Sequence, residues 1–290
     1  MVLRLGLVGR GPWGRNIERT LLSFPDVDVQ PIGRHDVATA GLDAVLVSTP
    51  SESHAEVALP YIEVGLPTFI EKPMATSVDD AERICDAAAR SGSLVFVGHL
   101  LLHHPAFERL LKILPALGGI RYVLNDSANN QTRDDASVLW DWLPHDLSMA
   151  RAIFGKDASV AQSWPLWGAE QPQAALSRFG FGETPVVCTT SWLSSQRRKQ
   201  LTVVCESGTL VFDDRAERKL SLHDAAGNVS FPTYDDQLPL SRELGRFVQA
   251  VRRGEADPSQ IEAGVSVVRM IAAAEASSKA GGKPIEIAPS

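Results

Sequence analysis

Lys72 ends an apolar run, within the tripeptide Glu71-Lys72-Pro73, where its amine could carry chemistry. A lysine that is partly desolvated beside a cationic ring has a lowered pKa, so it can exchange protons near neutral pH. Oxidising a secondary alcohol requires a hydride acceptor and a base for the hydroxyl proton. We therefore predict that Lys72 transfers the proton beside a nicotinamide ring. The simpler alternative is a surface lysine that follows a strand.

The second candidate for proton transfer, His145, lies in the segment Trp140-Asp141-Trp142-Leu143-Pro144-His145-Asp146. Asp141 is a good N-cap residue, so the pattern predicts a helix that begins there and is closed by Gly155. Pro144 would then fall in the first turn, where its missing N–H is tolerated. An imidazole one turn into this helix can relay a proton or hold a substrate hydroxyl. The alternatives are that Asp141 is a cap alone and that His145 is structural.

A glycine turn at the start of the chain could bind the phosphates of a dinucleotide. Leu3–Val8 is short and apolar and is typical of a buried parallel strand. Gly9 permits a tight turn, Gly11 allows a pyrophosphate to approach the backbone, and Gly14 allows close packing of a helix predicted over Trp13–Phe24. The first N–H groups of that helix would face the phosphates. A plain strand-to-helix turn is the alternative.

The second predicted strand, Val27–Ile32, ends near two candidate ribose ligands. Arg34 could pair with a 2′-phosphate, which would favour NADP, or Asp36 could bind the ribose hydroxyls of NAD. Residues 36–42 alone then separate this strand from the next, Ala44–Ser48. A parallel crossover normally needs a dozen or more residues, usually with a helix. We therefore predict a shortened crossover and a reduced wall around the adenosine.

Strands and helices alternate up to Gly98, which predicts an α/β domain with a parallel sheet covered on both faces. Beyond it, longer alternating segments predict a second domain of α+β class, with a large, mostly antiparallel open sheet. The boundary gives domains 1–100 and 101–290. The further strands expected are Thr68–Ile70, Leu94–Val97, Ile120–Ala128, Ser159–Leu166, Ala175–Phe181, Val186–Leu193 and Gln200–Phe212. The further helices expected are Ser53–Val64, Ser77–Ser91, His104–Leu114, Ser241–Arg253 and Gln260–Ser278.

Composition excludes several classes of protein. The 290 residues are 44% hydrophobic and 22% charged, as in ordinary globular proteins. A net charge of −7 without a basic stripe argues against a nucleic-acid partner. The three scattered cysteines have neither metal-ligand nor disulfide spacing, so we expect reduced thiols, no metal and a cytoplasmic protein. We identify no secretory signal and no apolar stretch long enough to span a membrane.

Together these features resemble the Gfo/Idh/MocA oxidoreductases. The resemblance covers nearly the whole chain and implies a Rossmann domain, NAD or NADP as cofactor, and a homodimer or homotetramer formed through the second sheet. It implies that Lys72 and His145 are the catalytic lysine and histidine and that Asp141 is the acid one turn earlier. The residues implied to bind the cofactor are Gly9, Gly11, Pro12, Trp13, Gly14, Arg34, Thr49, Pro50, His54, Glu71 and Lys72.

Within that family the chain most resembles nucleotide-sugar 3-dehydrogenases that act on UDP-N-acetylglucosamine or its uronate. This narrower resemblance rests on Gly98-His99 with His104-Pro105, on the segment around His145, and on Ser191-Trp192-Leu193. The candidate substrate contacts are His99, Arg133, Trp140 and Arg197. The cluster Arg197-Arg198-Lys199 is either a solvated strand end or a contact for an anionic substrate, and Asp146 is expected to be a helix-end charge.

Two other functions remain open. A non-catalytic ligand sensor or partner subunit could use the same fold, and the reduced adenosine wall favours it, whereas Lys72 and His145 argue against it. A reductase of small ketones or imines is also possible, because a fold does not fix its substrate.

Overall fold

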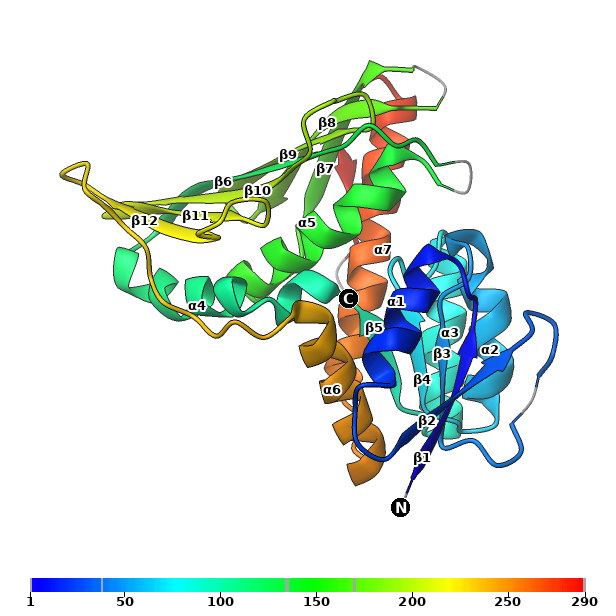
Figure 1. Cartoon of the computed structure of the whole chain (residues 1–290). Helices are drawn as coiled ribbons and strands as arrows, with labels where there is room; N and C mark the ends of the chain where they lie inside the picture. The colour runs from blue at the N-terminus through cyan, green and yellow to red at the C-terminus, as the bar shows by residue number, and fades with distance from the viewer. Residues whose placement is uncertain (1, 38, 134–135, 169–170, 289–290) are drawn as a thin grey trace. The chain divides into compact units, whose positions relative to one another are not determined.

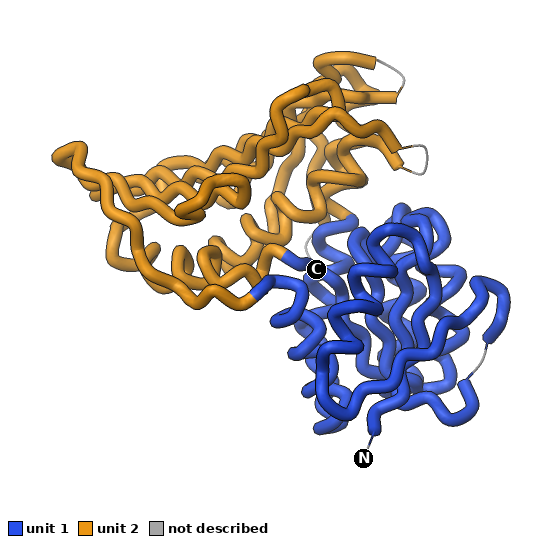
Figure 2. Tube along the Cα trace, in the orientation of Figure 1, with its two compact units in different colours: residues 1–100, 238–268 blue, residues 101–237, 269–290 orange. Residues whose placement is uncertain are grey.

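The computed structural model describes residues 2–37, 39–133, 136–168 and 171–288, and the chain folds as two compact units. Unit 1 comprises Met1–Leu100 and Leu238–Val268, and unit 2 comprises Leu101–Gln237 and Arg269–Ser290 (Figure 2). The first junction agrees with the predicted boundary at residue 100. The predicted domain 101–290 was wrong in one respect, because its segment 238–268 returns to unit 1.

Unit 1 is a parallel sheet in the order β2-β1-β3-β4-β5, with α1 and α6 on one face and α2 and α3 on the other (Figure 1). The predicted parallel sheet is therefore confirmed. Its strands are β1 (Leu3–Val8), β2 (Val27–Ile32), β3 (Ala44–Val47), β4 (Thr68–Glu71) and β5 (Val95–Gly98). Its helices are α1 (Pro12–Leu21), η1 (Ser51–Ser53), α2 (His54–Glu63), α3 (Val78–Ser91), α6 (Pro239–Arg253) and the first half of α7 (Pro258–Lys279).

Aromatic packing explains why α6 belongs to unit 1. Phe69 of β4 and Phe96 of β5 stack with their ring centroids 5.6 Å apart. Phe247 of α6 places its ring edge-on to both, at 5.6 Å from Phe69 and 5.9 Å from Phe96. Leu244 and Val248 join the same buried cluster. Burying such side chains stabilises a fold by roughly 1.5–3 kcal/mol each, which fixes α6 on this sheet.

The connection from β2 to β3 has no helix in its described residues, 33–37 and 39–43. The shortened crossover predicted from the sequence is therefore confirmed. At the other end of the sheet, α3 agrees with the predicted helix Ser77–Ser91 and is capped at both ends. Ser77 Oγ accepts a hydrogen bond from the backbone N–H of Asp80 at 3.1 Å, and Gly92 closes the helix with a φ of 69°.

Unit 2 is built on a sheet of nine strands in the order β13-β12-β11-β10-β6-β9-β8-β7-β14. The pairing of β6 with β9 is parallel and all other pairings in this sheet are antiparallel, as predicted. The strands are β6 (Ile120–Ala128), β7 (Val160–Trp167), β8 (Ala174–Phe181), β9 (Thr184–Ser191), β10 (Arg198–Cys205), β11 (Gly208–Asp213), β12 (Leu220–Asp224), β13 (Val229–Ser230) and β14 (Ile285–Glu286). The helices are η2 (Leu100–His103), α4 (Pro105–Ile113), η3 (Leu114–Leu117), α5 (Val138–Phe154) and the second half of α7.

Helices α4 and α5 pack on one face of this sheet (Figure 1). The predicted strand Gln200–Phe212 is in fact the hairpin of β10 and β11, which turns at Glu206 and Ser207. The polar residues Glu206 and Ser207, followed by Gly208, interrupt the apolar alternation and were the missed turn signal. The short strands β12, β13 and β14 were not predicted.

Helix α5 begins earlier than predicted. Its N-cap is Ser137, in an extended conformation, and the backbone N–H of Asp141 donates to Ser137 O at 3.0 Å. Asp141 is thus the fourth helical residue, and the prediction that it caps the helix was wrong. Pro144 lies inside the helix, beyond the first turn, whereas Gly155 ends it with a φ of 64° as predicted.

Candidate active site

Of the three glycines in the glycine turn, the packing of the fold requires Gly9 and Gly14 but not Gly11. Gly9 has a φ of 98°, and a Cβ there would lie 2.3 Å from Ser48 O. A Cβ on Gly14 would lie 2.0 Å from Gly9 O, so helix and strand could not approach as they do. A Cβ on Gly11, in contrast, would meet no atom within 4 Å. Packing within the described structure therefore does not demand Gly11, which fits the predicted approach of a pyrophosphate.

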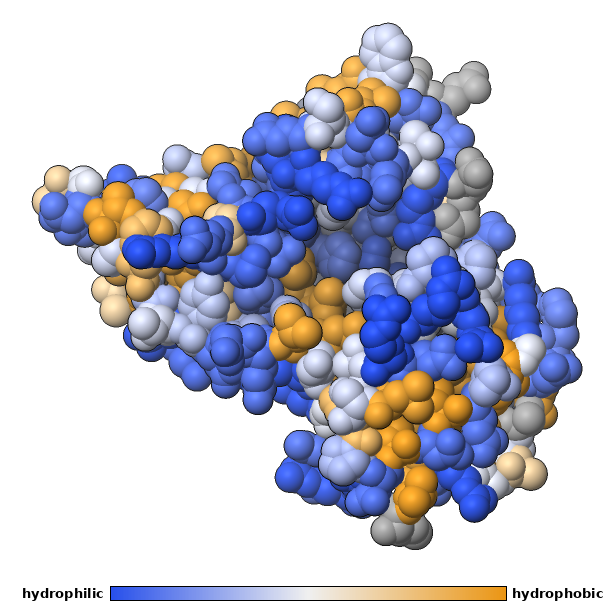
Figure 3. Space-filling model, in the orientation of Figure 1, coloured by the Kyte–Doolittle hydropathy of each residue, from blue (hydrophilic) through white to orange (hydrophobic). Residues whose placement is uncertain are grey.

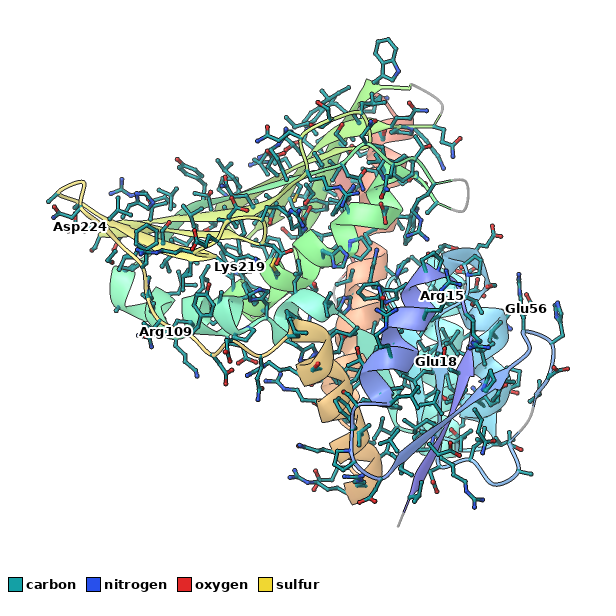
Figure 4. The ribbon with its side chains drawn as sticks, in the orientation of Figure 1. Arg15, Glu18, Glu56, Arg109, Lys219 and Asp224 are labelled. Carbon is teal, nitrogen blue, oxygen red and sulfur yellow. The ribbon has the colours of Figure 1, made fainter. Side chains whose placement is uncertain are left out.

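The N-terminus of α1 is prepared for an anion. Gly11 is its N-cap, no side chain caps it by a hydrogen bond, and Pro12 occupies the first helical position. The first backbone N–H groups of a helix lack intrahelical partners and favour phosphate. Two arginines border this turn. Arg10 donates from Nη2 to Glu18 at 3.1 Å, and Arg15 donates from Nη1 to Arg10 O at 3.1 Å, with Arg15 and Glu18 projecting from α1 (Figure 4).

The two candidate ribose ligands lie on the surface after β2. Arg34 Nη2 is 3.9 Å from Glu56 Oε2, with Glu56 labelled on α2 in Figure 4. The Asp36 carboxylate folds over Gly33, since a Cβ on that glycine would lie 2.3 Å from Asp36 Oδ2. A carboxylate beside Arg34 competes with a 2′-phosphate, whereas Asp36 is held where a hydroxyl could reach it. The choice between NAD and NADP stays a prediction.

His54 fastens two backbone segments together. It is 1% exposed, and its ring nitrogens each lie 2.8 Å from a carbonyl oxygen, Nδ1 from Pro73 O and Nε2 from Thr49 O. The turn after β3, which contains Thr49 and Pro50, is thereby tied to the segment after Lys72. These contacts are to the protein backbone, so any part of His54 in cofactor binding would be indirect.

Glu71 joins the glycine turn to the lysine. The indole N–H of Trp13 donates to Glu71 Oε1 at 2.6 Å, and the backbone N–H of Lys72 donates to Oε2 at 3.2 Å. Burial raises the pKa of Glu71 to about 7, an effect that the Trp13 hydrogen bond and the Lys72 charge oppose. Lys72 itself is half-buried and precedes a cis peptide bond to Pro73. Glu71 is therefore poised to gain or lose a proton beside the candidate base.

Glu243 of α6 is a buried acid that the sequence analysis missed. Its side chain is fully buried, and burial raises its pKa well above the usual range, with the Glu71 carboxylate adding to the effect. Its neighbour Leu244 and the residue one turn on, Phe247, belong to the core of unit 1. An acid on the apolar face of an amphipathic helix was the signal that could have found it.

Asp141 and His145 lie one turn apart on α5 in unit 2. The Asp141 carboxylate accepts from Arg133 Nη1 at 3.2 Å and from the indole N–H of Trp192 at 2.9 Å. His145 is partly exposed, and its ring centroid lies 6.4 Å from that of Trp142. Asp141 is thus oriented by two donors, one of them buried, while the imidazole remains within reach of a ligand.

Asp146, immediately after His145, forms a buried ion pair. Its Oδ1 lies 2.5 Å from Lys199 Nζ on β10, and Ser127 Oγ on β6 donates to it at 3.0 Å. The Lys199 ammonium also lies 5.5 Å from the ring centroid of Trp142. The expectation of a helix-end charge at Asp146 was wrong, and of the two alternatives for the Arg197–Lys199 cluster, a solvated strand end does not hold for buried Lys199. Lys199 lies on the same face of β10 as buried Leu201 and Val203, because residues two apart in a strand share a face. This spacing was the missed signal.

The four candidate substrate contacts differ in accessibility. Trp140 is 5% exposed and donates its indole N–H to Glu275 Oε1 at 3.1 Å, so it packs in the core of unit 2. His99 is also buried, at 3% exposure. Arg133 is partly exposed and bound to Asp141, and Arg197 is exposed. Accessibility therefore favours the two arginines over the ring residues.

Unit 1 brings together the glycine turn, Trp13, Glu71 and Lys72, and unit 2 brings together Asp141 and His145. A common cleft for Lys72 and His145 stays a prediction. In the part of the chain that the structure describes, no three His, Cys, Asp or Glu side chains gather as metal ligands. No described helix is both long and apolar enough to cross a membrane.

The parallel sheet with a phosphate-type glycine turn defines a dinucleotide-binding protein. Residues 22–99 match the model of the Gfo/Idh/MocA family, described as an oxidoreductase family with an NAD-binding Rossmann fold. Over these residues the chain is therefore similar to oxidoreductases whose Rossmann fold binds NAD.

Named relatives agree with this family. The chain is 26% identical to inositol 2-dehydrogenase 3 of Saccharopolyspora erythraea, over 88% of this chain and 87% of that protein. A crystal structure from Magnetospirillum magnetotacticum MS-1, described as an oxidoreductase, is 29% identical, with a TM-score of 0.85 over 94% of this chain and 100% of the other. UDP-N-acetylglucosamine 3-dehydrogenase of Acidithiobacillus ferrooxidans shares the fold at 18% identity, with a TM-score of 0.84 over 96% and 99% of the two chains.

Proposed function

We propose that this oxidoreductase transfers a hydride between NAD(P) and a secondary alcohol of a sugar or nucleotide sugar, with Lys72 and His145 as the proton-transfer pair. The observation that carries the proposal is the hydrogen bond from Trp13 to Glu71, at 2.6 Å. It links the glycine turn to the residue before Lys72, at the carboxyl end of β4. Ligands of parallel α/β sheets bind at that end of the strands.

The residues divide the work as follows. Gly11 and the first N–H groups of α1 would hold the pyrophosphate, and the bound nicotinamide would accept or donate the hydride. Lys72 takes the hydroxyl proton as the carbonyl forms, or returns it in reduction. Glu71 sets the charge beside that amine, because an ionised carboxylate favours the protonated lysine. His145 holds the hydroxyl or passes the proton to solvent, and Asp141 positions its helix turn.

The names of similar proteins frame the choice of substrate. The Saccharopolyspora relative is named for inositol, and the Acidithiobacillus structure for UDP-N-acetylglucosamine. Inositol and the sugar of UDP-N-acetylglucosamine each contain a ring that carries several hydroxyl groups. We propose such a ring as the substrate class, with oxidation at a secondary hydroxyl.

We also propose a homodimer or homotetramer formed through the open face of the unit 2 sheet. Tyr122 and Leu124 of β6 are 40% and 42% exposed on the face opposite buried Val123. Hydrophobic residues lie among hydrophilic ones over the visible surface of this unit (Figure 3). Apolar side chains that adjoin on one open sheet face, as Tyr122 and Leu124 do, are the kind of surface through which chains associate. Light scattering should show an assembly that Leu124→Lys dissociates.

Two measurements test the catalytic proposal. The purified protein is denatured and the supernatant analysed for NAD and NADP by mass spectrometry, and the apo protein is then titrated with each. Inositols, simple sugars and UDP-sugars are next screened for reduction of the cofactor. Lys72→Ala should lower kcat about 1,000-fold with an unchanged melting temperature. Lys112→Ala, which removes an exposed lysine on α4, is the matched control.

Normal turnover by Lys72→Ala would remove the proton-transfer role. Cofactor binding without turnover on any substrate would favour the ligand sensor on the same fold. Failure to bind either dinucleotide would overturn the proposed function itself.

A further inference from the structure

A basic hollow of about 220 Å³ lies in unit 2 where β10 begins and β11 ends. Four cationic residues line it, Arg197, Arg198, Lys199 and Arg215, and the one acid among them is Asp213. The whole chain has a net charge of −7, so this concentration of positive charge opposes the average of the protein. A hollow of one sign attracts ligands of the other.

Two of the four cations are already neutralised. Arg198 Nε lies 2.5 Å from Asp126 Oδ2, and its Nη1 donates to Ser194 Oγ at 3.1 Å. Lys199 is committed to the buried Asp146. These pairs hold the frame of the hollow and leave little charge for a ligand.

The other two, Arg197 and Arg215, are exposed, and within the described residues no side-chain partner binds either guanidinium. Asp213 forms no ion pair with either arginine in the described residues, since its Oδ1 accepts from the backbone N–H of Arg215 at 2.8 Å and its Oδ2 from Gln200 Nε2 at 3.4 Å; its charge offsets one of the two guanidiniums from within the hollow. Two such guanidiniums at the edge of one hollow form an anion site with planar, bidentate donors.

The loop that carries Arg215 is held in place by the protein. Lys219, labelled in Figure 4, donates from Nζ to Asp214 O at 2.6 Å and to Ala216 O at 3.4 Å. The backbone N–H of Asp214 donates to Lys199 O at 2.9 Å, which fixes the loop to β10. A pre-organised loop loses little conformational entropy when a ligand binds, which favours a specific site over a passing contact.

The hollow is also connected to the proposed catalytic helix. Lys199 lines it, and the ammonium of the same lysine binds Asp146, the residue after His145. Lys199 thus contributes both to the lining of the hollow and, through its ammonium, to the ion pair beside His145. Neutral polyols such as inositol carry no group that uses two unpaired guanidiniums.

We infer that the hollow binds the diphosphate of a nucleotide sugar, so that the substrate of the proposed dehydrogenase is a nucleotide sugar rather than a free polyol. The inference deepens the proposed function and rests on it for the reaction. The diphosphate recognition itself stands on Arg197 and Arg215.

Calorimetry with UDP, inorganic pyrophosphate and glucuronate tests the inference on the full-length protein. Wild type should bind UDP and pyrophosphate, more weakly as salt is added, and should not bind glucuronate measurably. The double variant Arg197→Gln/Arg215→Gln should weaken UDP binding about 100-fold, because two charge-assisted contacts are lost. Arg109→Gln removes the same charge from exposed Arg109 on α4 (Figure 4) and should bind UDP like wild type.

Equal UDP affinity in wild type and the double variant, or none in wild type, would overturn the inference. Tighter binding of glucuronate than of pyrophosphate would do so too, since it would assign the arginines to a carboxylate. NAD titration and inositol turnover of the same samples keep the two proposals apart. NAD binding and inositol oxidation without UDP binding would remove the diphosphate site and leave the dehydrogenase. UDP binding without any affinity for NAD would leave the diphosphate site and remove the proposed dehydrogenase.

Discussion

Each unit contains a buried acid beside a candidate proton-transfer residue, and the two acids are treated in opposite ways. Asp146, next to His145, meets a lysine ammonium and a serine hydroxyl. Glu71, next to Lys72, meets the neutral indole of Trp13 and interacts with Glu243, a second buried acid whose pKa is raised. One acid is fixed in a local ion pair, whereas the other has a pKa of about 7.

This difference means that Asp146 carries a structural charge, whereas Glu71 can titrate. A buried ion pair is difficult to break, because removing one partner leaves the other charge uncompensated. A buried acid with neutral donors and an acidic neighbour takes up a proton at ordinary pH. The Asp146 site is therefore suited to hold His145 in place, and the Glu71 site to vary the charge near Lys72.

The largest expected effect is the loss of the ion pair. Lys199→Met should reduce the free energy of unfolding by about 3–5 kcal/mol, because Asp146 is 0% exposed and would lose its counter-ion. Urea denaturation at pH 7 measures it. Lys112→Met on the surface of α4 is the control and should change the free energy by less than about 0.5 kcal/mol. If Lys199→Met also changed the free energy of unfolding by less than about 0.5 kcal/mol, Asp146 would be a titratable acid like Glu71 and not a fixed charge.

The next effect is the pH dependence of stability that Glu71 contributes. Its pKa is raised from 4.5 to about 7, so the native state binds more protons than the unfolded state between these pH values. The contribution of Glu71 to the free energy of unfolding is thus greatest below pH 4.5 and falls by about 3 kcal/mol as the pH rises to 7. Above that pH it stays constant. The Lys72 charge and the Trp13 hydrogen bond oppose this rise in pKa, and Glu243 is a buried acid of raised pKa that interacts with Glu71.

Glu71→Gln tests this by removing the titrating group and leaving Glu243. The free energy of unfolding of the variant, relative to wild type, should be lower at pH 5 than at pH 8 by roughly 2–3 kcal/mol. Glu56→Gln alters an acid whose side chain is 74% exposed and should show no such trend. A constant difference between wild type and Glu71→Gln across this range would contradict the assignment of a raised pKa.

The smallest effect concerns the hydrogen bond between the glycine turn and Glu71. Trp13→Phe keeps an aromatic ring and removes the indole N–H, so it should cost about 1 kcal/mol and move the titration of Glu71 to higher pH. Stability measured from pH 5 to 8 gives both quantities. Trp167→Phe, at a tryptophan that is 66% exposed on β7, is the matched control. An unmoved titration midpoint in Trp13→Phe would show that the bond does not tune this acid.

Local signals in the sequence predicted much of unit 1. Short apolar strands bounded by glycine gave β1 and β2 with their observed limits, and Ser77 and Gly92 gave the ends of α3, because each depends on neighbours in the chain. The cap of α5 failed because Ser137 and Asp141 are both good cap residues one turn apart. Local propensity could not choose between them.

The sequence pattern could not predict interactions between segments that lie far apart along the chain. Asp146 and Lys199 are 53 residues apart, and their pairing appears once β10 has a register against β6. The return of α6 to unit 1 depends on Phe247 meeting Phe69 and Phe96. Lys72, His145 and the glycine turn are candidates that residue type and local context suggest, whereas the burial of Glu243 and the partner of Asp146 depend on the folded structure.

The position of α6 in the chain has a consequence for biosynthesis. The ribosome releases β1 to β5 first, but the aromatic layer of Phe69 and Phe96 has no cover until Phe247 is translated. The segment that forms β1 to β5 therefore keeps part of its hydrophobic surface exposed while strands β6 to β13 of unit 2 are synthesised. The core of unit 1 is therefore completed only after most of unit 2 has been synthesised.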